Sequence, residues 1–275
     1  YNFTVTNESN LLPEVITERL RTFRVVVYDA EYDGYVRVKN YWDVINSIER
    51  GVKKLILAND FSVGGRTEDA LLSFDGVLIN PNGYEISIRD NWPLFRQLRE
   101  HAVVSGLRVN DGGEGFRPHI SSVVYDVCGM VCIFNAGAVA DCTVEADLYG
   151  GEQNGHYIRV AGIAGLNRSE STGDFRYGTI LRCSFTGNAY SGDDSAKVLG
   201  GSENPIGSPG GAYGIVCMDE DGIFDCIVQG DAYAYEGLSS AFACTLYHMP
   251  LRGIHRYADE FTAIAANGNR VFDLS

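Results

Sequence analysis

The chain has 275 residues, 45% of them hydrophobic, so it can bury a large core and is not an intrinsically disordered chain. Its formal net charge is -14 at pH 7, and residues 121–275 hold 19 of the 36 acidic but only 8 of the 22 basic residues. An acidic field repels phosphate backbones, so we expect no nucleic-acid partner. No uncharged run approaches the roughly 20 apolar residues that span a bilayer, so we expect no membrane insertion. Cationic partners or divalent ions fit this charge, as does solubility alone.

The first predicted elements are two helices and two strands. An amphipathic helix is expected over residues 10–23, a strand over 24–29, a second strand over 35–38 and a short helix over 41–50. Asn40 is a good N-cap for the second helix, and Gly51 suits its C-terminal end. Trp42, Ile45 and Ile48 recur every three residues, so we expect them to share one face of this helix.

Further strands are expected over residues 54–58, 73–79 and 84–88, with a turn at Asn82-Gly83 between the last two. Residues 91–98 form either a helical turn or a short inward-packing segment, which periodicity alone does not separate. We assign residues 1–70 to an N-terminal cap with the first coil. Residues 71–275 are assigned to repeats in one continuous domain.

From about residue 102 the chain resembles itself at intervals of tens of residues, which is typical of a stacked repeat protein. One set of copies is Gly129-Met130-Val131-Cys132, Gly162-Ile163-Ala164-Gly165, Gly214-Ile215-Val216-Cys217 and, more faintly, Ala241-Phe242-Ala243-Cys244. A second set places Cys142, Cys183 and Cys226 at one equivalent position, with Leu107 in an earlier copy.

Equivalent residues of neighbouring coils stack at about 4.8 Å and therefore form columns. The repeats predict one column of Cys132, Gly165, Cys217 and Cys244 and another of Leu107, Cys142, Cys183 and Cys226. We interpret these cysteines as small buried core residues rather than as a disulfide or metal framework. A disulfide within a column stays an open alternative, and Cys128 lies outside both columns.

The repeats are longer than the about 20–30 residues of a bare β-helix coil, so each coil is expected to carry a loop. The predicted loops are residues 147–157, 167–177, 187–213 and 229–240. The loop over 187–213 is the longest, and a loop of that length inside a compact domain is often functional.

Residues 161–167 (AGIAGLN), followed by residues 178–187 (GTILRCSFTG), resemble the GLUG-type repeat of bacterial surface proteins, including the non-catalytic parts of IgA-specific metallopeptidases. A fainter likeness lies in residues 74–76 with 82–86, so the resemblance covers roughly residues 71–245. Cys132 and Cys217 depart from it by replacing the second glycine. The resemblance implies an all-β fold, a single right-handed parallel β-helix of the pectate-lyase-like type with an N-terminal helical cap and long loops between rungs.

The resemblance supplies no catalytic residues, and the sequence contains no His-Glu-x-x-His, Gly-x-Ser-x-Gly or Cys-x-x-Cys motif. We therefore expect a non-catalytic bacterial protein, extracellular or on the cell surface. It would be adhesin-like and would bind a glycan or a host protein. The alternative is a carbohydrate-active enzyme, a polysaccharide lyase or glycoside hydrolase, on the same scaffold. A structural spacer in a longer surface protein is a third reading.

Candidate binding residues are aromatic and acidic side chains in or beside the predicted loops, because rings flanked by carboxylates suit sugars and protein contacts. They are Tyr157, Tyr177, Tyr190, Asp193, Asp194 and Tyr213. No residue is assigned to catalysis or to a metal. Asp219-Glu220-Asp221 and Asp193-Asp194 leave calcium open against a plain turn, and no other cofactor is expected.

Overall fold

The computed structural model describes residues 34–67, 70–118, 127–153, 156–168, 178–191, 211–219, 222–230, 232–234, 238–240, 244–245, 255–256 and 263–265. The chain divides into two compact units, Tyr1–Tyr35 and Val36–Ser275, and the description below concerns the second. The helix expected over residues 10–23 and the strand over 24–29 lie outside the described residues. The assignment of residues 1–70 and 71–275 stays a prediction.

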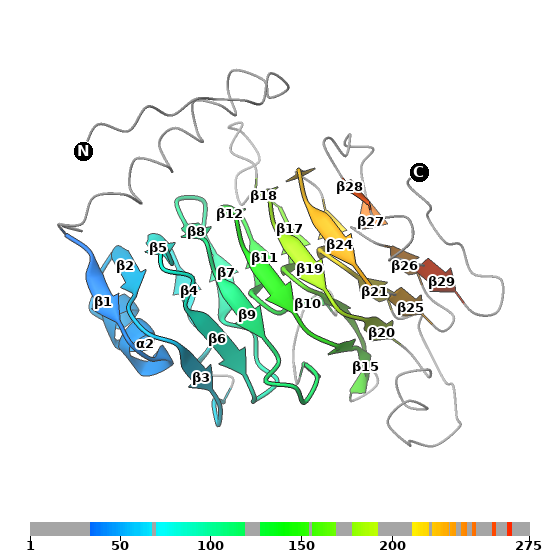
Figure 1. Cartoon of the computed structure of the whole chain (residues 1–275), viewed down its shortest axis with the longest axis horizontal. Coiled ribbons are helices and arrows are strands. Elements are labelled where there is room, and N and C mark those ends of the chain that lie inside the picture. Colours follow the sequence, from blue (N-terminus) through cyan, green and yellow to red (C-terminus); the bar gives the residue numbers. More distant parts are fainter. Residues whose placement is uncertain are drawn as a thin grey trace. The chain divides into compact units, whose positions relative to one another are not determined.

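The described part of this unit is all-β apart from one helix, as predicted (Figure 1). Its strands form five sheets, and all the pairings between named strands are parallel except the antiparallel pair β15–β16. Long-range parallel pairing requires the chain to return to the same edge after each excursion, so the sheets grow by one strand per return.

Each sheet is named by one of its strands. The β12 sheet contains β1 (Val36–Val38), β2 (Lys54–Leu57), β5 (Val77–Ile79), β8 (Val103–Ser105), β12 (Ala138–Ala140), β18 (Thr179–Leu181) and β23 (Ile223–Phe224). The β13 sheet contains β3 (Phe61–Val63), β6 (Glu85–Ile88), β9 (Arg108–Asn110), β13 (Thr143–Glu145), β19 (Ser184–Thr186), β24 (Ile227–Gln229) and β28 (His255–Arg256). The β11 sheet contains β4 (Ser73–Phe74), β7 (Phe95–Leu98), β11 (Cys132–Asn135), β17 (Ala164–Asn167), β22 (Val216–Asp219) and β27 (Cys244–Thr245).

Two smaller sheets complete the unit. The β14 sheet contains β14 (Leu148–Tyr149), β20 (Ala189–Ser191), β25 (Ala232–Ala234) and β29 (Ala263–Ala265). The β16 sheet contains β10 (Val127–Gly129), β16 (His156–Ala161), β21 (Gly211–Tyr213) and β26 (Leu238–Ser240), with β15 (Gly151–Gln153) on the side of β16.

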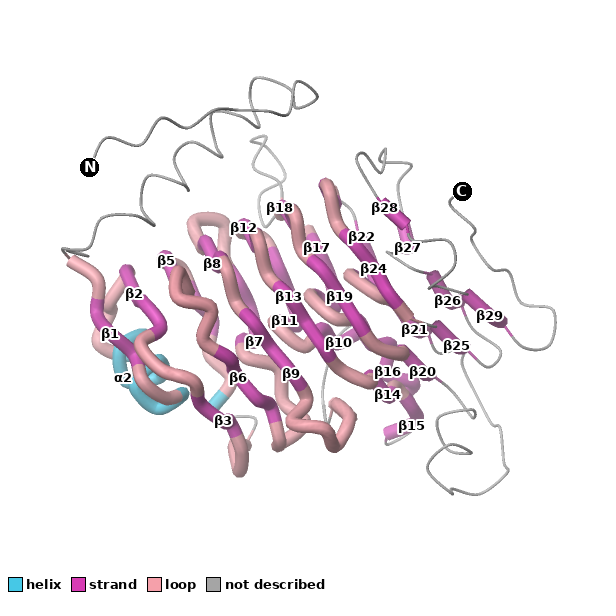
Figure 2. The backbone as a smooth tube through the Cα atoms, viewed as in Figure 1, coloured by secondary structure: helices cyan, strands magenta, loops and turns pink. Residues whose placement is uncertain are grey.

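The order of these sheets along the chain describes a coil (Figure 2). From β11 the chain visits the β12, β13, β14 and β16 sheets in turn and then returns to the β11 sheet as β17. An earlier coil is shorter, because β4, β5 and β6 lead directly back to β7. This succession of parallel returns is compatible with a β-helix-like fold.

The helix predicted over residues 41–50 is confirmed as α2 (Tyr41–Glu49), and the strand over 35–38 as β1. Asn40 caps α2, since its side-chain oxygen accepts a hydrogen bond from the backbone N–H of Asp43 at 2.9 Å. The expected apolar face is wrong in one member, because Trp42 is 57% exposed. The buried stripe instead starts at Tyr41 and continues through residues three and four positions later, Val44 and Ile45.

The strand expected over residues 73–79 is interrupted by a corner at Asp75-Gly76, which separates β4 from β5. Glycine is required there, because a Cβ on Gly76 would lie 2.4 Å from the carbonyl oxygen of Lys53 in the preceding coil. Of the two alternatives for residues 91–98, the inward-packing segment is confirmed. Trp92 and Leu94 are buried, and β7 begins at Phe95.

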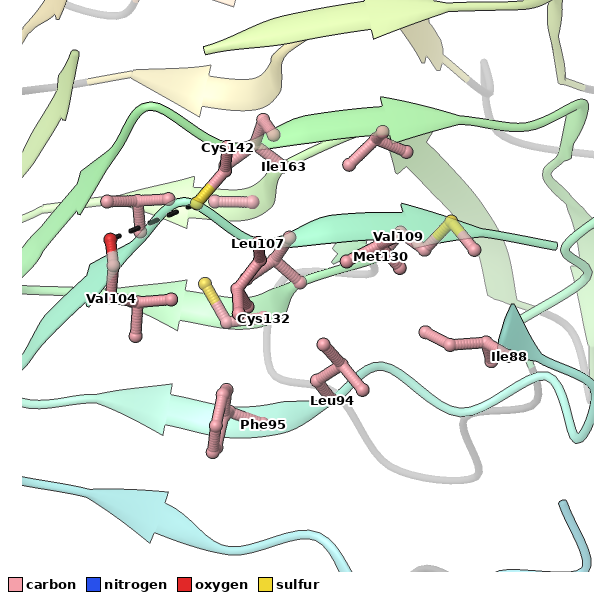
Figure 3. Close-up of a cluster of buried hydrophobic side chains, with 14 of the residues drawn as sticks. Ile88, Leu94, Phe95, Val104, Leu107, Val109, Met130, Cys132, Cys142 and Ile163 are labelled. Carbon is pink, nitrogen blue, oxygen red and sulfur yellow. Dashed lines mark hydrogen bonds between the residues drawn. The ribbon is translucent and has the colours of Figure 1, made fainter. Parts of the chain in front are cut away.

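Side chains from successive coils fill the interior of the stack (Figure 3). The second cysteine column is confirmed, because each coil donates a backbone hydrogen bond to the carbonyl of the preceding column member: Thr143 to Leu107, Ser184 to Cys142 and Ile227 to Cys183, at 2.8–2.9 Å. Cys142, Cys183 and Cys226 are free and buried. Burial raises the pKa of the Cys142 and Cys226 thiols, so these groups stay protonated and serve as core residues.

In the first cysteine column Gly165 lies opposite Cys217 as predicted, but Cys132 and Cys244 are each displaced by one residue. The β11 sheet pairs Cys132 with Ala164 and Ala164 with Val216, so Cys132 is not aligned with Cys217. Cys244 pairs with Met218 and is also displaced by one position. Successive strand residues point to opposite sides. Cys132 therefore joins the large core cluster, whereas Cys217 lies in a second, smaller one.

Parts of the predicted loops are strands. Residues 147–157 include β14 and β15, residues 187–213 include β20 and β21, and residues 229–240 include β25 and β26. Most of these strands are two or three residues long, so they show too little alternation of apolar and polar residues to be recognised in sequence. They build the two smaller sheets of each later coil.

Candidate functional site

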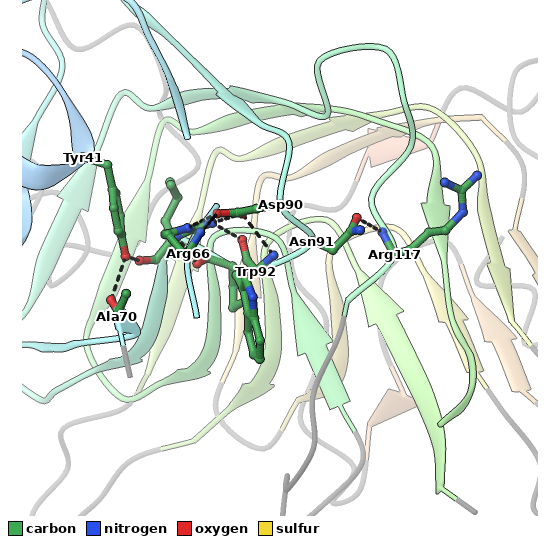
Figure 4. A network of polar contacts seen from close by, with 9 residues as sticks. Tyr41, Arg66, Ala70, Asp90, Asn91, Trp92 and Arg117 are labelled. Atoms are coloured by element: carbon green, nitrogen blue, oxygen red, sulfur yellow. Dashed lines mark hydrogen bonds and ion pairs between the residues drawn. The ribbon is translucent and has the colours of Figure 1, made fainter. Parts of the chain in front are cut away.

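The most concentrated polar network of the described residues is structural (Figure 4). The guanidinium of Arg66 donates to both carboxylate oxygens of Asp90 at 2.7 and 2.8 Å and to the carbonyl oxygens of Trp92 and Pro93. It also lies 4.5 Å from the ring centroid of Tyr41. The two charged side chains are 1% and 6% exposed, so no ligand can reach them. This network anchors α2 and the segment before β7 to the first coils.

The predicted calcium turn at Asp219 is part of a second structural network. Asn135 donates to the Asn167 side-chain oxygen at 2.8 Å, and Asn167 donates to Asp219 Oδ1 at 2.7 Å. Asp219 Oδ1 also accepts from the N–H of Gly222 at 3.2 Å, and all three side chains are fully buried. Within the described ranges no cluster of three or more His, Cys, Asp or Glu side chains could hold a metal ion. Calcium stays a prediction, because Asp193, Asp194, Glu220 and Asp221 lie outside those ranges.

A surface feature is formed by Arg117, Tyr149 and Tyr190, which we name the tyrosine edge. Tyr149 and Tyr190 occupy equivalent positions of neighbouring coils, and their rings stack with centroids 5.1 Å apart and an interplanar angle of 12°. The guanidinium of Arg117 lies 4.7 Å from the centroid of the Tyr149 ring. The β14 sheet continues this column at Tyr233.

Within the tyrosine edge, the Tyr149 ring presents its edge rather than its faces. Arg117 comes from the coil before Tyr149 and Tyr190 from the coil after it, so both faces of the Tyr149 ring are covered. Sugar stacking on that ring is therefore blocked, and contact is made through its edge and hydroxyl. Burial raises the pKa of Tyr149, as do Asp147 and Asp111, against the opposing charge of Arg117. The phenol thus stays neutral and can donate a hydrogen bond.

Carboxylates beside the tyrosine edge hold the corner between the β13 and β14 sheets. Asp111 Oδ2 accepts from the N–H of Asp147 at 2.9 Å, and Asp147 Oδ1 accepts from the N–H and side-chain amide of Asn188 at 3.0 and 3.1 Å. Gly115 lets the ring approach, since a Cβ there would lie 2.5 Å from Tyr149 Cε2. These contacts set the positions of the two tyrosines.

The adjoining β13 sheet carries a row of outward polar side chains, which with the tyrosine edge we name the polar strip. Thr143, Glu145, Ser184, Thr186 and Gln229 alternate along their strands with buried apolar residues such as Val144, Phe185 and Val228. The row is connected between coils, because Ser184 Oγ lies 3.1 Å from Thr143 Oγ1 and Thr186 Oγ1 lies 3.4 Å from Gln229 Oε1. Hydroxyls, an amide and a carboxylate therefore share one surface.

The predicted binding residues fall in different places. Tyr190 belongs to the tyrosine edge, whereas Tyr213 is 1% exposed and packs in the smaller core cluster with Leu166 and Cys217. The backbone of Tyr157 pairs with Glu152 in β15–β16. The side chain of Tyr157 and all of Tyr177, Asp193 and Asp194 lie outside the described residues.

Tyr149 lies in a predicted loop but is not among the candidate binding residues, and neither is Arg117. A signal for the tyrosines existed, since Tyr149, Tyr190 and Tyr233 each stand seven residues after Cys142, Cys183 and Cys226. No comparable signal marks Arg117.

Comparisons of the chain with protein-family models, with curated proteins and with solved structures gave no match. In the part of the chain that the structure describes, no helix has the length and apolar character needed to cross a bilayer. The fold and the site thus define an all-β protein of stacked parallel strands with a polar, tyrosine-bordered face.

Proposed function

We propose that residues 36–275 form a single right-handed parallel β-helix of the GLUG-repeat type and that it serves as a non-catalytic binding module on a bacterial surface. The repeated return of the chain to the same sheets supports the β-helix. The resemblance of residues 161–167 and 178–187 to exported bacterial repeats supports the location outside the cell.

The observation that carries the binding function is the polar strip. Thr143 lies opposite Ser184, and Glu145 lies opposite Thr186 and then Gln229, so polar groups of neighbouring coils can contact an extended ligand at a spacing of about 4.8 Å. A glycan chain, with hydroxyls that donate and accept hydrogen bonds, fits such a surface. The surface of a host-cell protein is the second ligand class, because tyrosines are enriched in protein interfaces.

Non-catalytic binding is favoured over the carbohydrate-active enzyme by the use of the carboxylates near the polar strip. Glycoside hydrolysis requires two carboxyl groups about 5–9.5 Å apart across one substrate site. Asp111 and Asp147 instead accept hydrogen bonds from backbone amides of their own corner.

The test is binding of the protein to a panel of neutral and acidic polysaccharides and host glycoproteins, comparing Thr186→Arg with Thr179→Arg. Both threonines are half-buried outward residues of neighbouring sheets, but only Thr186 lies in the polar strip. We expect Thr186→Arg to weaken binding at least about tenfold, which corresponds to a loss of about 1.4 kcal/mol of binding free energy. Thr179→Arg should leave binding unchanged.

Equal effects of the two variants would remove the polar strip as the binding surface. New reducing ends or unsaturated products in the polysaccharide incubations would show that the protein cleaves polysaccharides and would contradict the non-catalytic binding function. Localisation is tested separately, by asking whether antibodies against the protein label intact cells of the source bacterium.

A further inference from the structure

A cavity of about 250 Å³ lies apart from the polar strip, between the C-terminal end of α2 and the corner that joins β4 to β5. Its polar lining comes from three coils: Lys53 before β2, Ser73 and Asp75 beside the β4 corner, and Arg99 after β7. Val52 and Phe74 supply apolar wall. The cavity is smaller than the roughly 300–1,000 Å³ of sites for drug-sized ligands, so it suits a molecule of one sugar residue.

The lining of this cavity has a net positive charge, although the chain as a whole is acidic. Lys53 and Arg99 contribute two cations and Asp75 one anion, whereas the whole chain carries a formal net charge of -14. Lys53 Nζ lies 3.1 Å from Asp75 Oδ2, and His101 Nδ1 lies 3.4 Å from Asp75 Oδ1. The single carboxylate is thus already paired with the Lys53 ammonium, which leaves the Arg99 guanidinium as the second cation of the lining.

One feature opposes an anion, namely the C-terminal end of α2, where a helix carries partial negative charge. That partial charge is about half an elementary charge and is screened in an open site, whereas Lys53 and Arg99 are full charges. The balance at the cavity therefore favours an anionic ligand.

The remaining wall groups favour a hydroxylated ligand. Ser73 Oγ lies 3.5 Å from Gln97 Oε1, an amide oxygen that only accepts, so the serine hydroxyl points its proton there. The lone pairs of Ser73 Oγ then face donors such as sugar hydroxyls. The half-buried Val52 offers a small apolar contact to the C–H face of a sugar ring, whereas the Phe74 side chain is 1% exposed.

We infer that this cavity binds a hydroxylated anion of monosaccharide size, through its carboxylate or phosphate group on Lys53 and Arg99 and a hydroxyl group on Ser73. The shared chemistry of a sugar acid and a sugar phosphate is one anionic group beside several hydroxyls. This site is separate from the polar strip, so either can fail without the other.

The experiment is isothermal titration of the full chain with glucuronate, glucose 6-phosphate, glucose and inorganic phosphate. We expect millimolar binding of glucuronate or glucose 6-phosphate, with glucose and inorganic phosphate each at least about tenfold weaker. The stronger of the two sugar anions identifies the anionic group. Raising the salt concentration should weaken this binding, because exposed charges are screened.

The variants Arg99→Gln and Lys53→Met should each weaken the binding of the sugar anion at least about tenfold. Arg108→Gln, which removes an exposed cation from β9 outside the cavity lining, should leave binding unchanged. Since Lys53 and Arg99 are both exposed, these variants are expected to fold, which thermal melting verifies.

The inference is overturned if neither sugar anion binds, if glucose binds equally well, or if Arg99→Gln binds like the unchanged protein. If Thr186→Arg no longer binds the polysaccharide or glycoprotein ligand but still binds the sugar anion, the polar strip and the cavity are two separate sites. Sugar-anion binding lost in Thr186→Arg would place the ligand on the polar strip and would also overturn the inference.

Discussion

The coils of residues 36–118 and those from residue 127 onward are stabilised in different ways. The first coils are filled by large side chains such as Leu55, Leu78 and Phe74 and are tied by one buried ion pair. The later coils also bury large residues such as Phe185, but they add small ones such as Cys142 and are tied by interactions that recur from coil to coil. The early region therefore depends on single side chains, whereas the later region distributes its stability along columns.

This difference has a physical origin. The first coils pack against α2, which has no repeat of its own, so their side chains must fit one irregular surface. A later coil packs mainly on coils of similar sequence. The same residue type therefore fits at the equivalent position of each coil. The predictions below test this contrast, starting with the largest expected effect.

Arg66→Met should destabilise the protein most. Its loss leaves the buried carboxylate of Asp90 and the carbonyl oxygens of Trp92 and Pro93 without their donor. Breaking one side of a buried ion pair costs about 3–5 kcal/mol, and chemical denaturation measures it. Lys53→Met is the control, because the Lys53–Asp75 pair is exposed and worth at most about 1 kcal/mol. If both variants lose a similar free energy of unfolding, the early coils do not depend on the single buried ion pair.

Gly187→Ala should cost at least about 3 kcal/mol. Gly187 has φ +135°, and a Cβ there would lie 1.9 Å from the carbonyl oxygen of Ala146 in the preceding coil. Gly113→Ala is the matched control, since Gly113 has φ +80° but open space around a Cβ. Gly113→Ala should cost about 1 kcal/mol from backbone strain alone. If thermal melting gives the two variants equal Tm values, the corners of later coils tolerate a wider spacing between neighbouring coils.

Asn167→Ala should cost about 2–3 kcal/mol, because it leaves buried polar groups unsatisfied on two neighbouring coils. Asn167 donates to Asp219, Gly178 and Gly222 and accepts from Asn135. Asn188→Ala is the control, as the Asn188 side chain is half-buried and its bond to Asp147 is a surface contact. Unfolding in urea measures both losses. If Asn167→Ala is as stable as the unchanged protein, the hydrogen bonds between Asn135, Asn167 and Asp219 do not contribute to the stability of the later coils.

The contribution of the Arg66–Asp90 pair should disappear in acid. Burial alone would raise the pKa of Asp90, but the hydrogen bonds and charge of Arg66 outweigh it and lower this pKa below the ordinary 3.8. The stability it supplies is present above about pH 3.8 and is lost as the pH falls through the lowered folded-state value. The difference in Tm between the unchanged protein and Asp90→Asn should therefore shrink from pH 6 to pH 2.5. A constant difference would mean that the pair acts by shape rather than charge.

The smallest effect is expected at Arg182, a half-buried residue with φ +49° that donates hydrogen bonds from both Nε and Nη2 to Asp141 at 2.6 Å. Arg182→Ala should cost at most about 1 kcal/mol. Arg182→Gly loses the same pair but relieves the left-handed backbone, so it should be at least as stable as Arg182→Ala. Denaturation midpoints compare the two. A glycine variant clearly less stable than the alanine variant would show that the ion pair outweighs the backbone strain.

Prediction from sequence succeeded where one interaction recurs. The column of Cys142, Cys183 and Cys226 was visible because each member is followed by the same pattern of outward and inward residues. The column of Cys132 failed because neighbouring small residues look alike, and only the strand pairing shows that Cys132 lies opposite Ala164. The short strands β14, β15, β20, β21, β25 and β26 lie within segments that the sequence predicts as loops.

The candidate sites follow the same division. Tyr190 could be identified because aromatic residues recur near the predicted loops, and its partner Tyr149 has the same spacing from a cysteine. Arg117 could not be identified, since nothing in its local sequence shows that it will cover a ring of the next coil. The cavity between α2 and the β4 corner was also hidden, because Lys53 and Arg99 meet there from separate coils.

The amino-acid sequence by itself indicated that the later part of this chain repeats and that the cysteines Cys142, Cys183 and Cys226 belong in the core. Those properties follow from composition and from local patterns that recur along the chain. Only the tertiary structure decided the register of the coils, the covered faces of the tyrosines and the meeting of cations at the cavity. Each of these depends on which residues of different coils lie opposite one another, and a shift of one residue turns every side chain to the other side of its sheet.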